Sequence, residues 1–102
     1  GGDPQQVWTP EQEAEARAIA EQIVRTPGAE WVVNSVVSLA NIAATKIEFG
    51  HPGDARLVID ALAGILDKVG AELGNVEQPL RQTLAQLQMA FAERTAKPPP
   101  GS

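Results

Sequence analysis

Four sets of helix start and stop signals divide this sequence into short segments. Thr9-Pro10-Glu11-Gln12 places a hydroxyl at the cap, proline at the first helical position and glutamine where a capping box requires it. Thr26-Pro27 repeats the start signal, Gly53-Asp54 opens a third segment and Asn75 caps a fourth. A glycine that suits a left-handed helix end follows the second and the third segments. The signals predict four helices, at residues 10–25, 27–49, 53–73 and 76–95.

The short connections limit how these helices can be arranged. Helices joined by a few residues pack roughly antiparallel or meet at a sharp corner. We expect an all-α protein, a small bundle of four helices in which the second is central and the third and fourth form an antiparallel hairpin. Residues 9–95 form a single helical domain in this interpretation, between a flexible N-terminal segment at residues 1–8 and a flexible proline-rich tail at residues 96–102.

The composition excludes several classes of protein. The 102 residues include 8 Lys and Arg against 13 Asp and Glu, a net charge of -5, and no cysteine. An acidic chain lacks the cations that a binder of the phosphate backbone needs, so no nucleic-acid partner is expected. Without cysteine there is no disulfide and no thiolate metal site. No apolar run reaches the roughly 20 residues that span a bilayer, so we expect no membrane partner and a cytoplasmic location.

The second predicted helix has no charge between Trp31 and Thr45 and four valines in its first half. A β-strand at residues 31–37 is the rival interpretation, because β-branched residues favour strands. The apolar residues come in pairs rather than alternating, and this spacing favours a helix. At about 100° per residue they form one wide arc, made of Val32, Val33, Val36, Val37, Leu39, Ala40, Ala43, Ala44 and Ile47.

The other helices have narrower apolar faces. The third is cleanly amphipathic, with Gly64 and Asp67 on its polar arc, and the fourth carries a narrow row of leucines that ends at a phenylalanine. The first is the weakest, because Ile19, Ile23 and Val24 are its large apolar residues and alanines separate them.

A second apolar strip lies on the far side of the second helix. Trp31, Ile42 and Phe49 fall within about 20° of one another at helical spacing. Small hydroxyl residues border this line and let another helix approach closely. A helix that is apolar on two sides is usually buried on two sides, and the second side can meet another helix of the chain or another copy. We therefore predict a protein interface, and a homodimer, at Trp31, Ser35, Ser38, Ile42, Thr45 and Phe49.

The chemically reactive residues form no recognisable site. His51, the single histidine, lies in a Gly-His-Pro-Gly loop, where a solvated side chain is the simplest interpretation. Asp60 and Asp67 share a face of the third helix, but basic residues flank them, as on an ordinary solvated face. We expect no metal, no cofactor and no enzymatic activity. The second predicted helix also carries an uncharged polar stripe, made of Asn34, Ser38, Asn41 and Thr45. This stripe fits a solvent-exposed edge, an oligomer contact or the lining of a ligand pocket.

Several short motifs occur together in one known family. They are Ser38-Leu39-Ala40, Ile59-Asp60-Ala61-Leu62, Leu73-Gly74 and the closing row Leu84, Leu87, Met89, Phe91 and Glu93. In this order and spacing, over about residues 26–94, the chain resembles the bacterial family catalogued as domain of unknown function eighteen forty-four, and its actinobacterial branch in particular. Gln88 stands where many relatives have arginine. The resemblance implies a small cytosolic all-helical protein without an assigned activity, with a weak link to translation.

These observations lead to a main hypothesis and three alternatives. The main hypothesis is a non-enzymatic, self-associating adaptor or regulatory binding module. The first alternative is a small-molecule-binding bundle, with a pocket between the second helix and the hairpin of the third and fourth. The second is a binder of a partner helix along the same apolar strip, and the third is an enzyme.

Overall fold

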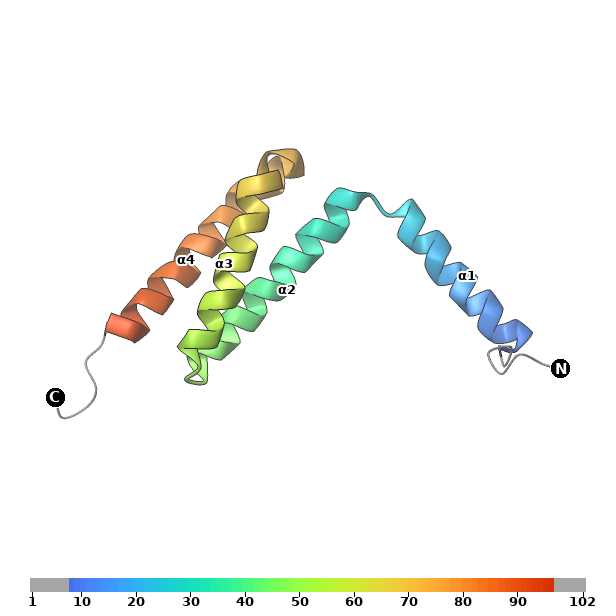
Figure 1. The fold of residues 1–102 in the computed structure, drawn as a ribbon. Helices are drawn as coiled ribbons and strands as arrows, with labels where there is room; N and C mark the ends of the chain where they lie inside the picture. The colour runs from blue at the N-terminus through green and yellow to red at the C-terminus, as the bar shows by residue number, and fades with distance from the viewer. Residues whose placement is uncertain (1–7, 97–102) are drawn as a thin grey trace.

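The structure, a computed structural model, describes residues 8–96, which are almost entirely helical (Figure 1). The elements follow one another as α1 (Pro10–Arg25), α2 (Gly28–Glu48), α3 (Pro52–Val69), the 3-10 helix η1 (Gly70–Val76) and α4 (Glu77–Ala96). The described residues contain no β-strand, so the all-α prediction is confirmed and the strand alternative at residues 31–37 is wrong. Of the two segments expected to be flexible, residues 1–7 and 97–102 lie outside the described part of the chain.

α2, α3 and α4 pack together as a three-helix bundle in which successive helices run in opposite directions (Figure 1). Leu62, Leu66 and Val36 are its largest fully buried side chains, and none of the described polar side chains is buried. Burial of one large aliphatic side chain contributes roughly 1.5–3 kcal/mol, so this core is the main source of stability. Its residues are Val36, Ala40, Ala43, Ile47, Ala55, Ile59, Leu62, Leu66, Leu73, Leu80, Leu84 and Leu87.

The predicted bundle of four helices is wrong in one respect, because α1 is not part of it. α1 meets α2 at the corner that joins them and reaches neither α3 nor α4 (Figure 1). None of its residues is buried, and the Cα radius of gyration is 19.9 Å, against about 13 Å for a compact chain of this length. α2 is therefore one of three helices that share a core, rather than a central helix with neighbours on two sides.

Thr26 and Pro27 connect α1 to α2 and explain why α1 stands apart. The Thr26 hydroxyl donates to the Gln22 carbonyl oxygen at 2.8 Å, so Thr26 ends α1 and does not cap α2, contrary to the start signal inferred from the sequence. Pro27 precedes α2 without a side-chain cap, and both residues have extended backbone. Across the corner, the indole N–H of Trp31 donates to the Ile23 carbonyl oxygen at 3.3 Å.

Two other predicted helix boundaries are confirmed. Thr9 and Gln12 form the capping box at the start of α1: the Gln12 N–H donates to the Thr9 hydroxyl oxygen at 3.1 Å, and the Thr9 N–H donates to the Gln12 side-chain oxygen at 2.8 Å. Gly50 follows the end of α2 with a φ of 85°, a conformation that residues with a Cβ rarely adopt. These local signals fix the start of α1 and the turn from α2 into α3.

The third helix was predicted to continue to Leu73, and the structure differs from this prediction at the corner between α3 and α4. α3 ends at Val69, and η1 follows it, with a φ of 66° at Gly74. Gly70, the first residue of η1, is buried because side chains of α4 lie directly against it. A Cβ at Gly70 would be 3.0 Å from Glu77 Oε2 and 3.1 Å from Arg81 Nη2. The chain therefore turns where glycine allows close contact with α4.

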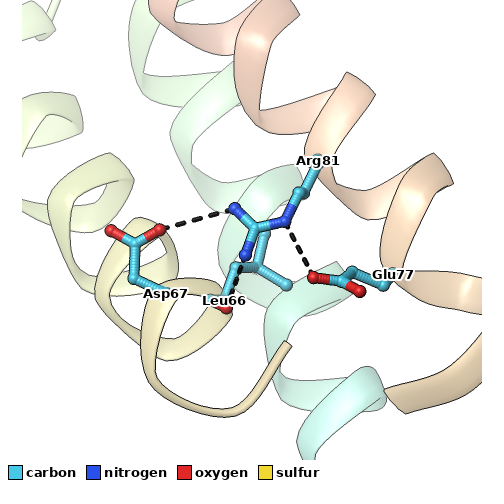
Figure 2. A network of polar contacts seen from close by, with 4 residues as sticks. All are labelled: Leu66, Asp67, Glu77 and Arg81. Carbon is cyan, nitrogen blue, oxygen red and sulfur yellow. Dashed lines mark hydrogen bonds and ion pairs between the residues drawn. The ribbon is translucent and has the colours of Figure 1, made fainter. Parts of the chain in front are cut away.

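Arg81 holds this corner together (Figure 2). Its guanidinium donates to the Leu66 carbonyl oxygen at 2.9 Å, to Glu77 Oε2 at 3.0 Å and to Asp67 Oδ1 at 3.4 Å. The hydrogen bond to Glu77, partly opposed by desolvation, raises the pKa of Arg81 above its ordinary value, and Asp67 adds to the increase. The Leu66 carbonyl oxygen also accepts the N–H of Gly70, so one backbone oxygen joins α3, η1 and α4.

Gly70→Ala is expected to lower the free energy of unfolding by about 1 kcal/mol, because the added methyl group forces Glu77 Oε2 and Arg81 Nη2 to shift and weakens their hydrogen bonds. Gly64→Ala is the matched control, since nothing lies within 4 Å of a Cβ added there. It should raise the free energy of unfolding by about 0.5–1 kcal/mol. Urea unfolding at low protein concentration measures both variants. A stabilising Gly70→Ala would contradict this description of the corner.

Candidate protein-interaction surface

The six residues of the predicted interface lie together on the outside of α2. Its large side chains Trp31, Ile42 and Phe49 are 41%, 44% and 71% exposed, and the three hydroxyl residues between them are exposed as well. The face of α2 that contributes to the core points the other way. We name this surface the outer strip of α2, and it consists of Trp31, Ser35, Ser38, Ile42, Thr45 and Phe49.

Two hydroxyl groups of the outer strip are bonded within the helix. Ser35 donates to the Trp31 carbonyl oxygen and Thr45 to the Asn41 carbonyl oxygen, each at 2.9 Å. A hydroxyl that bonds to the preceding turn is already a satisfied donor and contributes little to the recognition of a polar ligand. The strip thus presents large apolar side chains separated by small residues, which suits contact with another helix.

An open groove with a volume of about 630 Å³ runs between α2 and α3 beside the outer strip. Trp31 and Ser35 belong both to the outer strip and to the α2 wall of this groove. On the α3 wall, Ala61 and Gly64 have small or absent side chains, which keep the groove open. We name it the α2–α3 groove, and its lining residues are Trp31, Val32, Ser35, Ala61, Gly64, Ile65, Lys68 and Val69.

The α3 side of this surface was not predicted from the sequence. Leu57 is 63% exposed, and helical spacing places it on the same side of α3 as Gly64 and Lys68. The amphipathic pattern had assigned that side to solvent, because charged residues also lie there. Leu57 itself is the signal that could have identified it, as a large apolar side chain outside the core face of its helix.

α1 carries a second apolar face that no described residue covers. Ile19 is 62% exposed, Ile23 51% and Val24 83%. At about 100° per residue, two alanines fall within the same arc, while Ala18 lies on the opposite side. The sequence had placed this face inside a four-helix bundle. We name it the apolar face of α1, and it consists of Ala16, Ile19, Ala20, Ile23 and Val24.

The carboxylates of α3 are held in separate ion pairs. Asp60 lies 2.7 Å from Arg56, and Asp67 lies 3.4 Å from Arg81, so the two carboxylates that share a face have different partners. His51 is exposed and makes no side-chain hydrogen bond to the start of α3. Within the described part of the chain, no group of three or more His, Asp or Glu side chains could hold a metal ion.

Lys46 and Asp54 link α2 to α3, with Lys46 Nζ 2.7 Å from Asp54 Oδ2. The hydrogen bond from Lys46, and then its charge, hold the pKa of Asp54 below its ordinary value of 3.8. Because folding favours the charged carboxylate, this contribution to stability is present above the unfolded-state pKa. It is lost as the pH falls through the lower, folded-state pKa. Asp54 is exposed and Lys46 is half-buried, so solvent screens the pair and the contribution is small.

Lys46→Met is expected to raise the pKa of Asp54 toward 3.8, because it removes both the hydrogen bond and the neighbouring positive charge. Lys68→Met is the control, since Lys68 does not contribute to the lowered pKa of Asp54. An NMR titration of the Asp54 carboxyl carbon measures the pKa in each variant. The same Asp54 pKa in Lys46→Met and in the wild type would show that the pair does not form in solution.

The fold and its surfaces define an all-helical protein in which a three-helix bundle and a separate helix both expose apolar faces. None of the helices described in residues 8–96 combines the length and the apolar character needed to cross a membrane. Comparison with models of protein families, with curated proteins and with solved structures finds no match for this chain. Its function is therefore argued from the surfaces themselves.

Proposed function

We propose that this protein is a non-enzymatic adaptor or regulatory binding module that forms a homodimer through the outer strip of α2. The observation that carries the proposal is the exposure of Trp31, Ile42 and Phe49 along one side of a single helix. Large apolar side chains aligned on one face of a helix suit contact with a partner helix, and aromatic residues are enriched at protein interfaces. These three side chains lie outside the core, which does not require them to be apolar. Their apolar character therefore supports contact with a binding partner.

The chemistry of the outer strip supports a second copy as that partner. With two-fold symmetry, the same strip lies on both sides of the interface. The strip contains no charged residue, so two copies can meet there without like-charge repulsion, although each chain has a net charge of -5. The small side chains of Ser35 and Ser38 leave room for the partner helix to approach.

Several finer expectations remain predictions. They are membership of the family of domain of unknown function eighteen forty-four, a cytoplasmic location and a link to translation. The resemblance brings no activity with it, and we assign no cofactor. The separate ion pairs of Asp60 and Asp67 support a role in binding rather than in catalysis.

A small-molecule-binding bundle is the alternative, and the α2–α3 groove is the observation that favours it. Its volume of about 630 Å³ lies within the range of roughly 300–1,000 Å³ that is common for ligand pockets. Its polar groups are few, however: Lys68 provides a cation, and the Ser35 hydroxyl already donates to the Trp31 carbonyl oxygen. The groove therefore suits an apolar helix better than a polar small molecule.

Ile42→Glu is expected to convert the dimer to a monomer at about 100 μM, because it places an unpaired carboxylate in the interface. Val37→Glu is the matched control. Val37 is 43% exposed, against 44% for Ile42, but it lies on the opposite edge of α2. Sedimentation velocity measures the oligomeric state, and circular dichroism checks that each variant folds. A wild-type monomer at this concentration, or equal dissociation by both variants, would overturn the proposal.

A further inference from the structure

Two apolar surfaces of this chain are complementary, and neither has a partner among the described residues. In a four-helix bundle, the fourth helix lies in the groove between two of the others. The α2–α3 groove is such a position, and α4 contributes none of its lining. α1 is an amphipathic helix that lies outside the bundle (Figure 1). The chain thus contains both a groove for a fourth helix and a helix that could fill it.

α1 is long enough to cover the groove. α1 has 16 residues, which corresponds to about 24 Å at 1.5 Å per residue. Along α3 the lining of the groove runs from Ala61 to Val69, which is about 12 Å. Beyond the lining residues, Leu57 of α3 and Ile42 of α2 are also exposed. A helix of the length of α1 is therefore long enough to cover the groove and to extend beyond it toward Leu57 and Ile42.

The two surfaces also match in side-chain size and charge. On the apolar face of α1, alanines lie beside the isoleucines, and in the groove Ala61 and Gly64 lie beside larger aliphatic residues. Small residues on both sides let the two helix backbones approach closely. Helical spacing places Glu15 at one border of the apolar face of α1, where Lys68 of the groove can pair with its carboxylate, and Arg17 at the other border. Glu13 lies within the same arc, one turn before Ala16.

The connection between α1 and α2 directs α1 away from its own groove. Proline fixes its own φ and disfavours helical backbone at the preceding residue, so Thr26 and Pro27 both hold the chain extended. Trp31 occupies the inside of the corner, where its indole bonds to the Ile23 carbonyl oxygen. Folding α1 back would break this bond and would change the extended backbone of Thr26 and Pro27. Short, stiff connections favour the exchange of an element between copies.

We propose that α1 of one copy packs its apolar face into the α2–α3 groove of a second copy, which returns its own α1 in the same way. The exchange completes a four-helix bundle around each core and closes with two-fold symmetry. It also brings Trp31 and Ile42 of the outer strip into the interface. This arrangement rests on the self-association proposed above and specifies which segment of the partner covers the surface.

Cross-linking between single cysteines tests the exchange, because the chain has no cysteine of its own. One full-length chain carries Ala20→Cys in the apolar face of α1, and a co-expressed chain with a different tag carries Ala61→Cys in the groove. A short bismaleimide should give a cross-linked dimer of the two different chains, which neither variant forms alone. Ala18→Cys, on the opposite side of α1, replaces Ala20→Cys as the control and should not cross-link.

A chain that carries both Ala20→Cys and Ala61→Cys distinguishes exchange of α1 between copies from packing of α1 onto the groove of its own chain. Exchange gives a cross-linked dimer on a denaturing gel. A cross-linked monomer would mean that α1 folds onto its own groove and would overturn the proposal. The absence of any cross-link between the two sites would overturn it as well.

Charge substitutions in α1 distinguish this proposal from the self-association on which it rests. The variant with both Ile19→Glu and Ile23→Glu is expected to raise the dimer dissociation constant at least about tenfold. Ala18→Glu should leave it within about twofold. Sedimentation equilibrium measures both, and neither site is part of the core. If the double variant dimerises like the wild type, the exchange is wrong and the outer strip remains the interface. If the wild type is a monomer, both proposals fail.

Discussion

The aliphatic core shared by α2, α3 and α4 determines what remains for the rest of the chain. Leu62 and Leu66 of α3 and Val36 of α2 fill its centre, and leucines of α4 close it. Three helices complete this core, so the bundle does not need α1 to cover it. The apolar residues of α1 and of the outer strip of α2 are therefore surplus to the fold of the single chain. This surplus is the physical basis for association with a second copy.

Local signals in the sequence were sufficient to place most of the helices. The capping box of Thr9 and Gln12 joins residues within one turn, and Gly50 adopts the positive φ that suits a helix end. The core face of α2 was predictable for the same reason, because Val36, Ala40 and Ala43 recur with the helical period. The outer strip followed from the same periodicity applied to the residues left over. Features that depend on neighbours along one helix are readable from its sequence.

Features that depend on two helices were not readable in this way. Thr26-Pro27 has the composition of a helix start, yet the hydrogen bond from Thr26 to Gln22 makes Thr26 the end of α1. The position of α1 depends on that corner, and no local pattern specifies it. Gly70 lies where η1 begins, and Arg81 and Glu77 of another helix lie directly against it. The α2–α3 groove likewise exists only where two helices lie side by side, so Gly64 seemed to belong to an ordinary polar arc.

The two tryptophans stand at opposite ends of α1, and this has a consequence for spectroscopy. Trp8 precedes the first turn of α1, Trp31 bonds across the corner after its last turn, and both are exposed. The chain has no tyrosine, and no indole contributes to the buried core. Intrinsic fluorescence therefore reports on the two ends of α1 and on the α2–α3 groove beside Trp31, whereas backbone circular dichroism is dominated by the bundle. Thermal transitions followed by the two signals need not coincide. Such a mismatch would report local unfolding around α1 and would not by itself be evidence of a folding intermediate.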